Sequence, residues 1–112
     1  MSLDEKSPPQ LLLSILLEHY ENGRYDNAEK LALTITQEFP IHQFSWKILG
    51  AVLGQTDRKY ESLVVAQKFI QLAPLDTEAH YNLAVILQEL GKLEEAEVSY
   101  KQAIALKPNF VK

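Results

Sequence analysis

The sequence contains no cysteine, and this absence excludes disulfide bonds, thiolate zinc sites, iron–sulfur clusters and cysteine nucleophiles. Only four of the 112 residues are glycine, and they form no glycine-rich loop of the kind that holds a phosphate group. Basic residues are outnumbered by acidic ones, 11 to 15, which leaves a formal net charge of −4. A chain with this balance lacks the electrostatic footprint of a protein that binds nucleic acid or anionic membranes.

Long apolar runs are also missing. The stretch from Leu11 to Leu17, with Ser14 inside it, is far shorter than the roughly 20 residues that a membrane-spanning helix needs. It follows acidic rather than basic residues and lacks a small-residue cleavage site, so it does not fit a signal peptide. We interpret it as a buried helix and expect a soluble, cytoplasmic protein that begins with a polar leader or expression scar, residues 1–7.

The residues that commonly carry catalysis are scattered. His19, His42 and His80 lie far apart in the sequence, and none belongs to a metal-binding spacing such as H-x-x-H. No serine is followed or preceded by a histidine and an acid at the spacing of a known nucleophile motif. The sequence therefore predicts no catalytic residue, no cofactor and no metal site, and hence no enzyme activity in this chain.

The positive signal is a period of 34 residues. Pro40, Pro74 and Pro108 are 34 residues apart, and each closes one repeat. A second set of helix breakers with the same spacing, Gly23, Asp57 and Gly91, lies halfway through each repeat. Apolar residues between the breakers recur at intervals of three and four, as in Ala79, Leu83, Ile86 and Leu90, which indicates helices that each bury one face. Each 34-residue repeat is thus predicted to be two helices joined by a tight turn.

End signals agree with this assignment. Ser7 is expected to cap the first helix, with Pro8 and Pro9 in its first turn and Gln10 three residues after the cap. Asp76 is expected to cap the fifth helix, while Gly23 and Gly91 suit the left-handed ends of helices. His80 stands where a large packed side chain is expected, which favours a structural role for it over metal binding.

The third repeat resembles the tetratricopeptide repeat, through Ala79, Tyr81, Asn82, Leu83 and Ala84 followed by Gly91, Ala96, Tyr100, Ala103 and Pro108. The second repeat matches through Trp46, Leu49, Gly50, Ala66 and Pro74, and the first through Gly23, Tyr25, Ala28 and Pro40. Three positions depart from the family pattern, because Leu16, Asp57 and Phe69 replace small residues.

The resemblance implies an all-α fold, a right-handed superhelical array of three antiparallel helix pairs (an α-solenoid) with a concave inner surface formed by the first helices. We expect one repeat domain over residues 8–112, with repeats at about 9–42, 43–76 and 77–110.

The inner face of this array is predicted to bind a protein or peptide segment, because aromatic rings, amides and one cation line it. The residues expected to make contact are Tyr20, Phe44, Lys47, Tyr81, Asn82 and Gln88. The predicted function is therefore a protein–protein interaction module. Two alternatives stay open: a non-catalytic N-terminal segment of a larger enzyme such as a transferase, and a self-association element.

The third repeat is followed by Phe110, Val111 and Lys112, where a fourth repeat would begin. Repeat arrays usually finish with a helix whose outer side is polar, and the sequence shows none. We expect that a longer protein continues beyond Lys112 with further repeats or a catalytic domain, or that a homo-oligomer forms through the last helix, Leu93 to Lys107; the two expectations are compatible.

Overall fold

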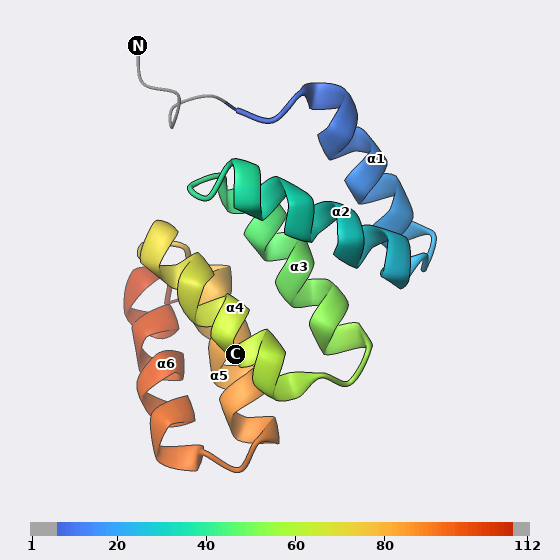
Figure 1. Ribbon diagram of the computed structural model, residues 1–112. Helices are drawn as coiled ribbons and strands as arrows, with labels where there is room; N and C mark the ends of the chain where they lie inside the picture. The colour runs from blue at the N-terminus through green and yellow to red at the C-terminus, as the bar shows by residue number, and fades with distance from the viewer. Residues whose placement is uncertain (1–6, 109–112) are drawn as a thin grey trace. The chain divides into compact units, whose positions relative to one another are not determined.

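A computed structural model describes residues 7–108. All regular secondary structure in that range is helical, which confirms the predicted all-α class of six consecutive helices (Figure 1). The helices are α1 (Gln10–Glu21), α2 (Tyr25–Glu38), α3 (Gln43–Gln55), α4 (Lys59–Leu72), α5 (Thr77–Glu89) and α6 (Leu93–Leu106). The predicted leader lies outside the described residues except for Ser7, and so do Phe110 to Lys112.

The turn inside each repeat has the same backbone geometry. Gly23, Asp57 and Gly91 adopt φ values of 73°, 59° and 78°, which lie in the left-handed region. The residue after each of them donates its N–H to a carbonyl five positions earlier, from Arg24 to His19, Arg58 to Leu53 and Lys92 to Leu87, at 2.8–2.9 Å. These are the hydrogen bonds of a Schellman motif, which ends a helix by satisfying its last carbonyls.

The corner between repeats is held by a ring N–H group. Nε1 of Trp46 donates to the carbonyl of Pro40 at 2.8 Å. The residue 34 positions later, His80, uses Nε2 to donate to the carbonyl of Pro74 at 2.7 Å. The buried His80 thus has the structural role that its position in the repeat predicted, because it ties the start of α5 to the preceding proline corner.

Of the two residues predicted to cap the start of a helix, one does so and the other does not. Asp76 caps α5 as predicted, since its side chain accepts a hydrogen bond from the N–H of Ala79 at 2.9 Å. The prediction for Ser7 is wrong, because the N-cap residue of α1 is Pro9 and no side chain caps that helix. The carbonyl of Pro9 accepts from the N–H groups of Leu12 and Leu13 instead, so the two prolines move the start of the helix beyond the reach of Ser7.

The chain forms two compact units that divide after Arg58. In the N-terminal unit, α2 packs against both α1 and α3, around buried Leu16, Ala28, Ala32, Ile35, Ile48, Leu49 and Val52. In the C-terminal unit, α5 packs against α4 and α6, around Leu63, Leu87 and Ala96 with Leu83, Ile86, Leu90 and Tyr100 against them. The single repeat domain over residues 8–112 stays a prediction.

Candidate functional site

A hollow of about 330 Å³ opens in the N-terminal unit between α1 and the start of α3. Its walls are the apolar side chains of Leu13, Leu17 and Phe44, and its polar lining consists of Gln10, Ser14 and His42. Spacings of three and four residues bring Gln10, Leu13, Ser14 and Leu17 to one face of α1. The second residue of α3, Phe44, closes the hollow from the neighbouring helix. No lysine, arginine, aspartate or glutamate is among the lining residues.

His42 connects this hollow to the beginning of α3. It is the N-cap residue of that helix, and its Nδ1 lies at a hydrogen-bonding distance of 3.2 Å from Oγ of the buried Ser45. Burial lowers the pKa of His42 below the ordinary histidine value, because a partly desolvated ring resists protonation. The neutral imidazole therefore offers the hollow a hydrogen-bonding group without a charge.

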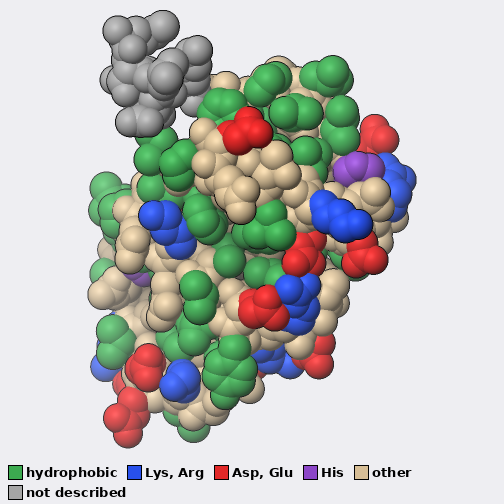
Figure 2. Space-filling view, viewed as in Figure 1, with side chains coloured by type: hydrophobic (Ala, Val, Ile, Leu, Met, Phe, Trp, Pro, Cys, Tyr) green, Lys and Arg blue, Asp and Glu red, His purple; other side chains and the backbone are tan. Residues whose placement is uncertain are grey.

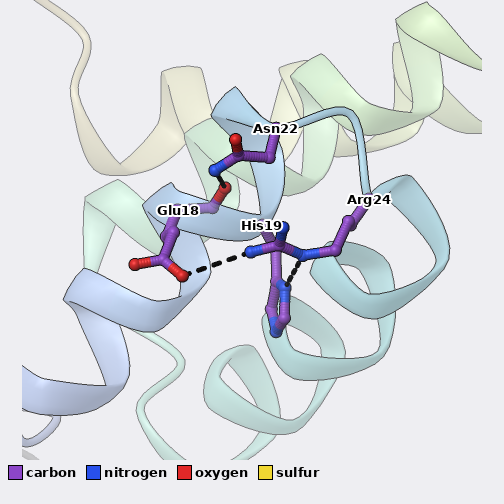
Figure 3. A network of polar contacts seen from close by, with 4 residues as sticks. All are labelled: Glu18, His19, Asn22 and Arg24. Atoms are coloured by element: carbon purple, nitrogen blue, oxygen red, sulfur yellow. Dashed lines mark hydrogen bonds and ion pairs between the residues drawn. The ribbon is translucent and has the colours of Figure 1, made fainter.

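Tyr20 lies at the other end of α1, away from the residues that line the hollow. Its ring packs against Tyr25 of α2, with the centroids 6.0 Å apart. Beside it, Nε of Arg24 donates to Nδ1 of His19 at 2.9 Å and the guanidinium pairs with Glu18 at 3.3 Å, while the amide of Asn22 donates to the carbonyl of Glu18 (Figure 3). This polar network stabilises the turn between α1 and α2, and Tyr20 and Tyr25 flank that turn in the sequence.

Three of the predicted contact residues lie on α5 in the C-terminal unit. Tyr81 packs edge-on against Tyr100 of α6, with ring centroids 5.7 Å apart, and the hydroxyl of Tyr100 donates to Oε1 of Gln88 at 2.7 Å. Burial of the hydroxyl raises the pKa of Tyr100, and electrostatic interactions with Tyr81 and Glu89 raise it further. The hydroxyl of Tyr100 therefore stays protonated and able to donate. Asn82 is exposed on the same helix.

The structure therefore groups the predicted residues by unit. Phe44 shares the hollow with Gln10, Leu13 and Leu17 of α1. Tyr81 and Gln88 are linked through Tyr100, whereas Tyr20 pairs with Tyr25 and Lys47 is exposed on α3.

Sequence reasoning missed His42, Ser14 and Tyr100. His42 lies in the corner between helices, where the apolar period carries no information. Tyr100 matched the family pattern, and nothing in the sequence singled out its hydroxyl. The spacing of Ser14, four residues after Gln10 and three before Leu17, is the one pattern that could have placed it with the others.

Within residues 7–108, no three histidine, aspartate or glutamate side chains are grouped so that they could hold a metal ion. No helix in that same range has the length and apolar character needed to cross a membrane.

In a comparison with known families, the model for the tetratricopeptide repeat matches residues 77–110. Among curated proteins, the peroxisomal targeting signal receptor of Candida glabrata is 28% identical over 98 residues, which are 88% of this chain and 17% of the receptor. The Saccharomyces cerevisiae receptor of the same name is 28% identical over 88 residues, 79% of this chain and 14% of the receptor. This chain thus spans less than a fifth of the length of either relative.

Two solved structures match this chain over a larger share of their own length than the receptors do. MamA superposes with a TM-score of 0.85 and 22% identity, over 90% of this chain and 59% of MamA. The Yersinia enterocolitica type III secretion chaperone SycD, in complex with a peptide of the translocator YopD, superposes with a TM-score of 0.85 and 20% identity, over 91% of this chain and 78% of the chaperone. At these identities the two structures show the fold alone.

Proposed function

Because the chain belongs to the tetratricopeptide repeat family, we propose that it is a protein-interaction module that binds an extended peptide segment and catalyses no reaction. The similar proteins support this proposal by their names: two are receptors for a targeting signal, and one is a chaperone solved with a bound peptide. The observation that carries it is the hollow lined by Leu13, Leu17 and Phe44.

The chemistry of that hollow defines the kind of side chain that it receives. Three large apolar walls favour an aliphatic or aromatic side chain, because its burial removes apolar surface of both partners from water. A charged side chain would lose hydration there without meeting an opposite charge, since all six lining residues are uncharged when His42 is neutral. The amide of Gln10 and the hydroxyl of Ser14 can hydrogen-bond the peptide backbone beside that side chain.

The tyrosine pair in the C-terminal unit supplies a second contact of different character. The hydrogen bond from Tyr100 occupies Oε1 of Gln88, which orients the amide and leaves its NH₂ group to donate. An oriented NH₂ group fits a backbone carbonyl of a bound peptide, and the edge of Tyr81 offers an apolar surface beside it. We propose that the two contacts act on the same class of ligand, an extended segment with at least one large apolar side chain.

A random peptide library displayed on phage tests the proposal directly. The wild-type chain is expected to select peptides that share a large apolar residue, and Leu13→Ser and Phe44→Ala are each expected to weaken binding of those peptides by about tenfold or more. Fluorescence anisotropy of a labelled selected peptide measures the affinity, and thermal unfolding checks that each variant folds.

The matched control is Leu33→Ser, which makes the same change as Leu13→Ser at an exposed leucine of α2 outside the hollow. It is expected to bind the selected peptides as the wild type does. If Leu33→Ser and Leu13→Ser weaken binding equally, or if no peptide family is selected, the hollow is not the binding site.

A further inference from the structure

The contact of α2 with α3, which joins the first repeat to the second, lies inside the N-terminal unit. There α2, the second helix of one repeat, packs against α3, the first helix of the next. Glu29 of α2 pairs with Arg58, in the turn after α3, through Oε1 and Nη1 at 2.6 Å. Near the end of α2, Thr36 is only 4% exposed, and Ser45 and Leu49 of α3 are buried. These residues define what one repeat presents to the next.

The 34-residue period shows which positions are equivalent at the two ends of the array. On α6, Glu97 is the counterpart of Glu29 and Ile104 is the counterpart of Thr36. On the N-terminal side, Arg24 is the counterpart of Arg58, and Leu11 and Ile15 of α1 are the counterparts of Ser45 and Leu49.

These equivalent faces are exposed and chemically complementary. Ile104 is 43% exposed, Leu11 71% and Ile15 37%, and hydrophobic side chains gather over α1 (Figure 2). Glu97 and Arg24 have opposite charges, as Glu29 and Arg58 have. At the intervening positions the residues are Leu63 and Lys92, which cannot form an ion pair, so opposite charge is not a general property of the repeat.

We propose that a second copy of this chain stacks its α1 on α6 of the first, using the arrangement by which α3 packs on α2. Glu97 of one copy then pairs with Arg24 of the next, and Ile104 packs against Leu11 and Ile15. The present partners of the two charged groups, Lys101 for Glu97 and Glu18 with His19 for Arg24, form exposed contacts (Figure 3) that hold them weakly and permit the exchange.

The contact joins two different surfaces and is therefore heterologous, so each added copy presents a new free α6 and assembly is open-ended. This distinguishes the proposal from pairing of α6 with α6, which would stop at a dimer.

Analytical ultracentrifugation of the full chain tests the proposal through a charge swap. The average mass of the wild type is expected to rise above the 12.8 kDa monomer as the concentration increases from low to high micromolar. Arg24→Glu and Glu97→Lys, each alone, place like charges opposite one another and are expected to lose that rise. An equimolar mixture of the two variants, or the double variant, restores opposite charges at every contact and is expected to recover it.

The apolar part of the contact has its own matched pair of variants. Ile104→Asp is expected to abolish association, whereas Val98→Asp is expected to leave it unchanged, because Val98 and its counterpart Val64 are both exposed. Circular dichroism verifies the fold of every variant, and if Arg24→Glu fails to fold, Glu97→Lys and the Ile104 and Val98 pair decide. A wild type that stays monomeric at high micromolar concentration overturns the proposal. So does association that Ile104→Asp abolishes and Arg24→Glu leaves unchanged, since α6 then pairs with itself.

Discussion

Asp57 is a single residue that carries a backbone conformation better suited to glycine. Its φ of 59° places it in the left-handed region, where the Cβ atom of an L-residue crowds the following carbonyl oxygen. Gly23 and Gly91 occupy the same position in the other two repeats. Aspartate tolerates this region better than most residues because its short side chain hydrogen-bonds locally, and so the turn forms without glycine.

We predict that Asp57→Gly is more stable than Asp57→Ala by about 1 kcal/mol. Both variants lose the carboxylate and its contacts, so the difference reports the conformational cost of a Cβ atom at positive φ. Urea unfolding followed by circular dichroism measures it. Gly23→Ala should cost a similar amount, because no atom lies within 4 Å of the added Cβ there. Equal stability of the two Asp57 variants would show that the turn relaxes out of the left-handed region.

His42 makes the stability of the chain depend on pH. Its pKa is lowered by burial in the folded state, whereas in the unfolded state it has its ordinary value of about 6.5. The unfolded chain therefore takes up the proton first as the pH falls. The contribution of His42 is complete above the unfolded pKa and decreases as the pH falls through that value toward the folded pKa.

The corresponding prediction is that His42→Gln reduces the loss of stability between pH about 7.5 and about 5.5. Glutamine does not titrate, so the difference between the two chains isolates His42 from His19 and His80, which both chains retain. Urea unfolding at the two pH values measures the difference. If the wild type and the variant lose the same stability, His42 does not contribute.

At the scale of helices, close packing depends on small buried residues. Ala84 of α5 is fully buried, and its counterparts in the other repeats are Gly50 and Leu16. The fully buried Leu16 shows that the position can hold a larger side chain where the surrounding helices leave space for it. The side chains around Ala84 pack against a methyl group, so a larger side chain there would displace them.

Ala84→Leu is expected to destabilise the chain by about 1–3 kcal/mol, because the larger side chain forces its neighbours out of their preferred rotamers. Ala105→Leu makes the same substitution at an exposed position of α6 and should change stability by less than about 0.5 kcal/mol. The midpoints of urea unfolding compare the two. A similar cost at both sites would attribute the effect to helix propensity rather than to packing.

The helices and turns could be predicted from the sequence because their signals are local and repeated. Proline ends a helix through its own geometry, and a left-handed residue ends one through its own φ, so 34-residue spacings of both kinds were sufficient. The capping of α1 was predicted wrongly. Serine is a residue type that commonly caps helices, but Pro8 and Pro9 separate Ser7 from the first residue of α1.

The candidate site was less predictable because it depends on which side chains meet across helices. The hydroxyl of Tyr100 reaches Gln88 only because of the rotation of α6 against α5, which apolar periodicity does not determine. His42 joins the hollow from a corner that belongs to no helix face. The contact residues Tyr20, Phe44, Lys47, Tyr81, Asn82 and Gln88 stay a prediction that the peptide selection tests.

At the scale of the whole molecule, each unit has a core of only three helices. A small unit buries a smaller fraction of its surface than a large domain does and is correspondingly less stable. Stacking of a further helix on α6 or α1 would bury Ile104, Leu11 and Ile15, which water now reaches. Because only the folded chain presents these faces, association adds to stability by mass action.

It follows that the thermal midpoint of the wild type should increase with protein concentration, whereas those of Arg24→Glu and Glu97→Lys should stay constant. A stabilisation of about 1 kcal/mol corresponds to a rise of roughly 4 °C in a chain of this size. Differential scanning calorimetry over the concentration range of the sedimentation experiment measures it, and the double variant should regain the dependence. If the sample that sedimentation shows to be associated instead has a midpoint independent of concentration, the unfolded chain associates as strongly as the folded one. That result would contradict a contact made by folded helix faces.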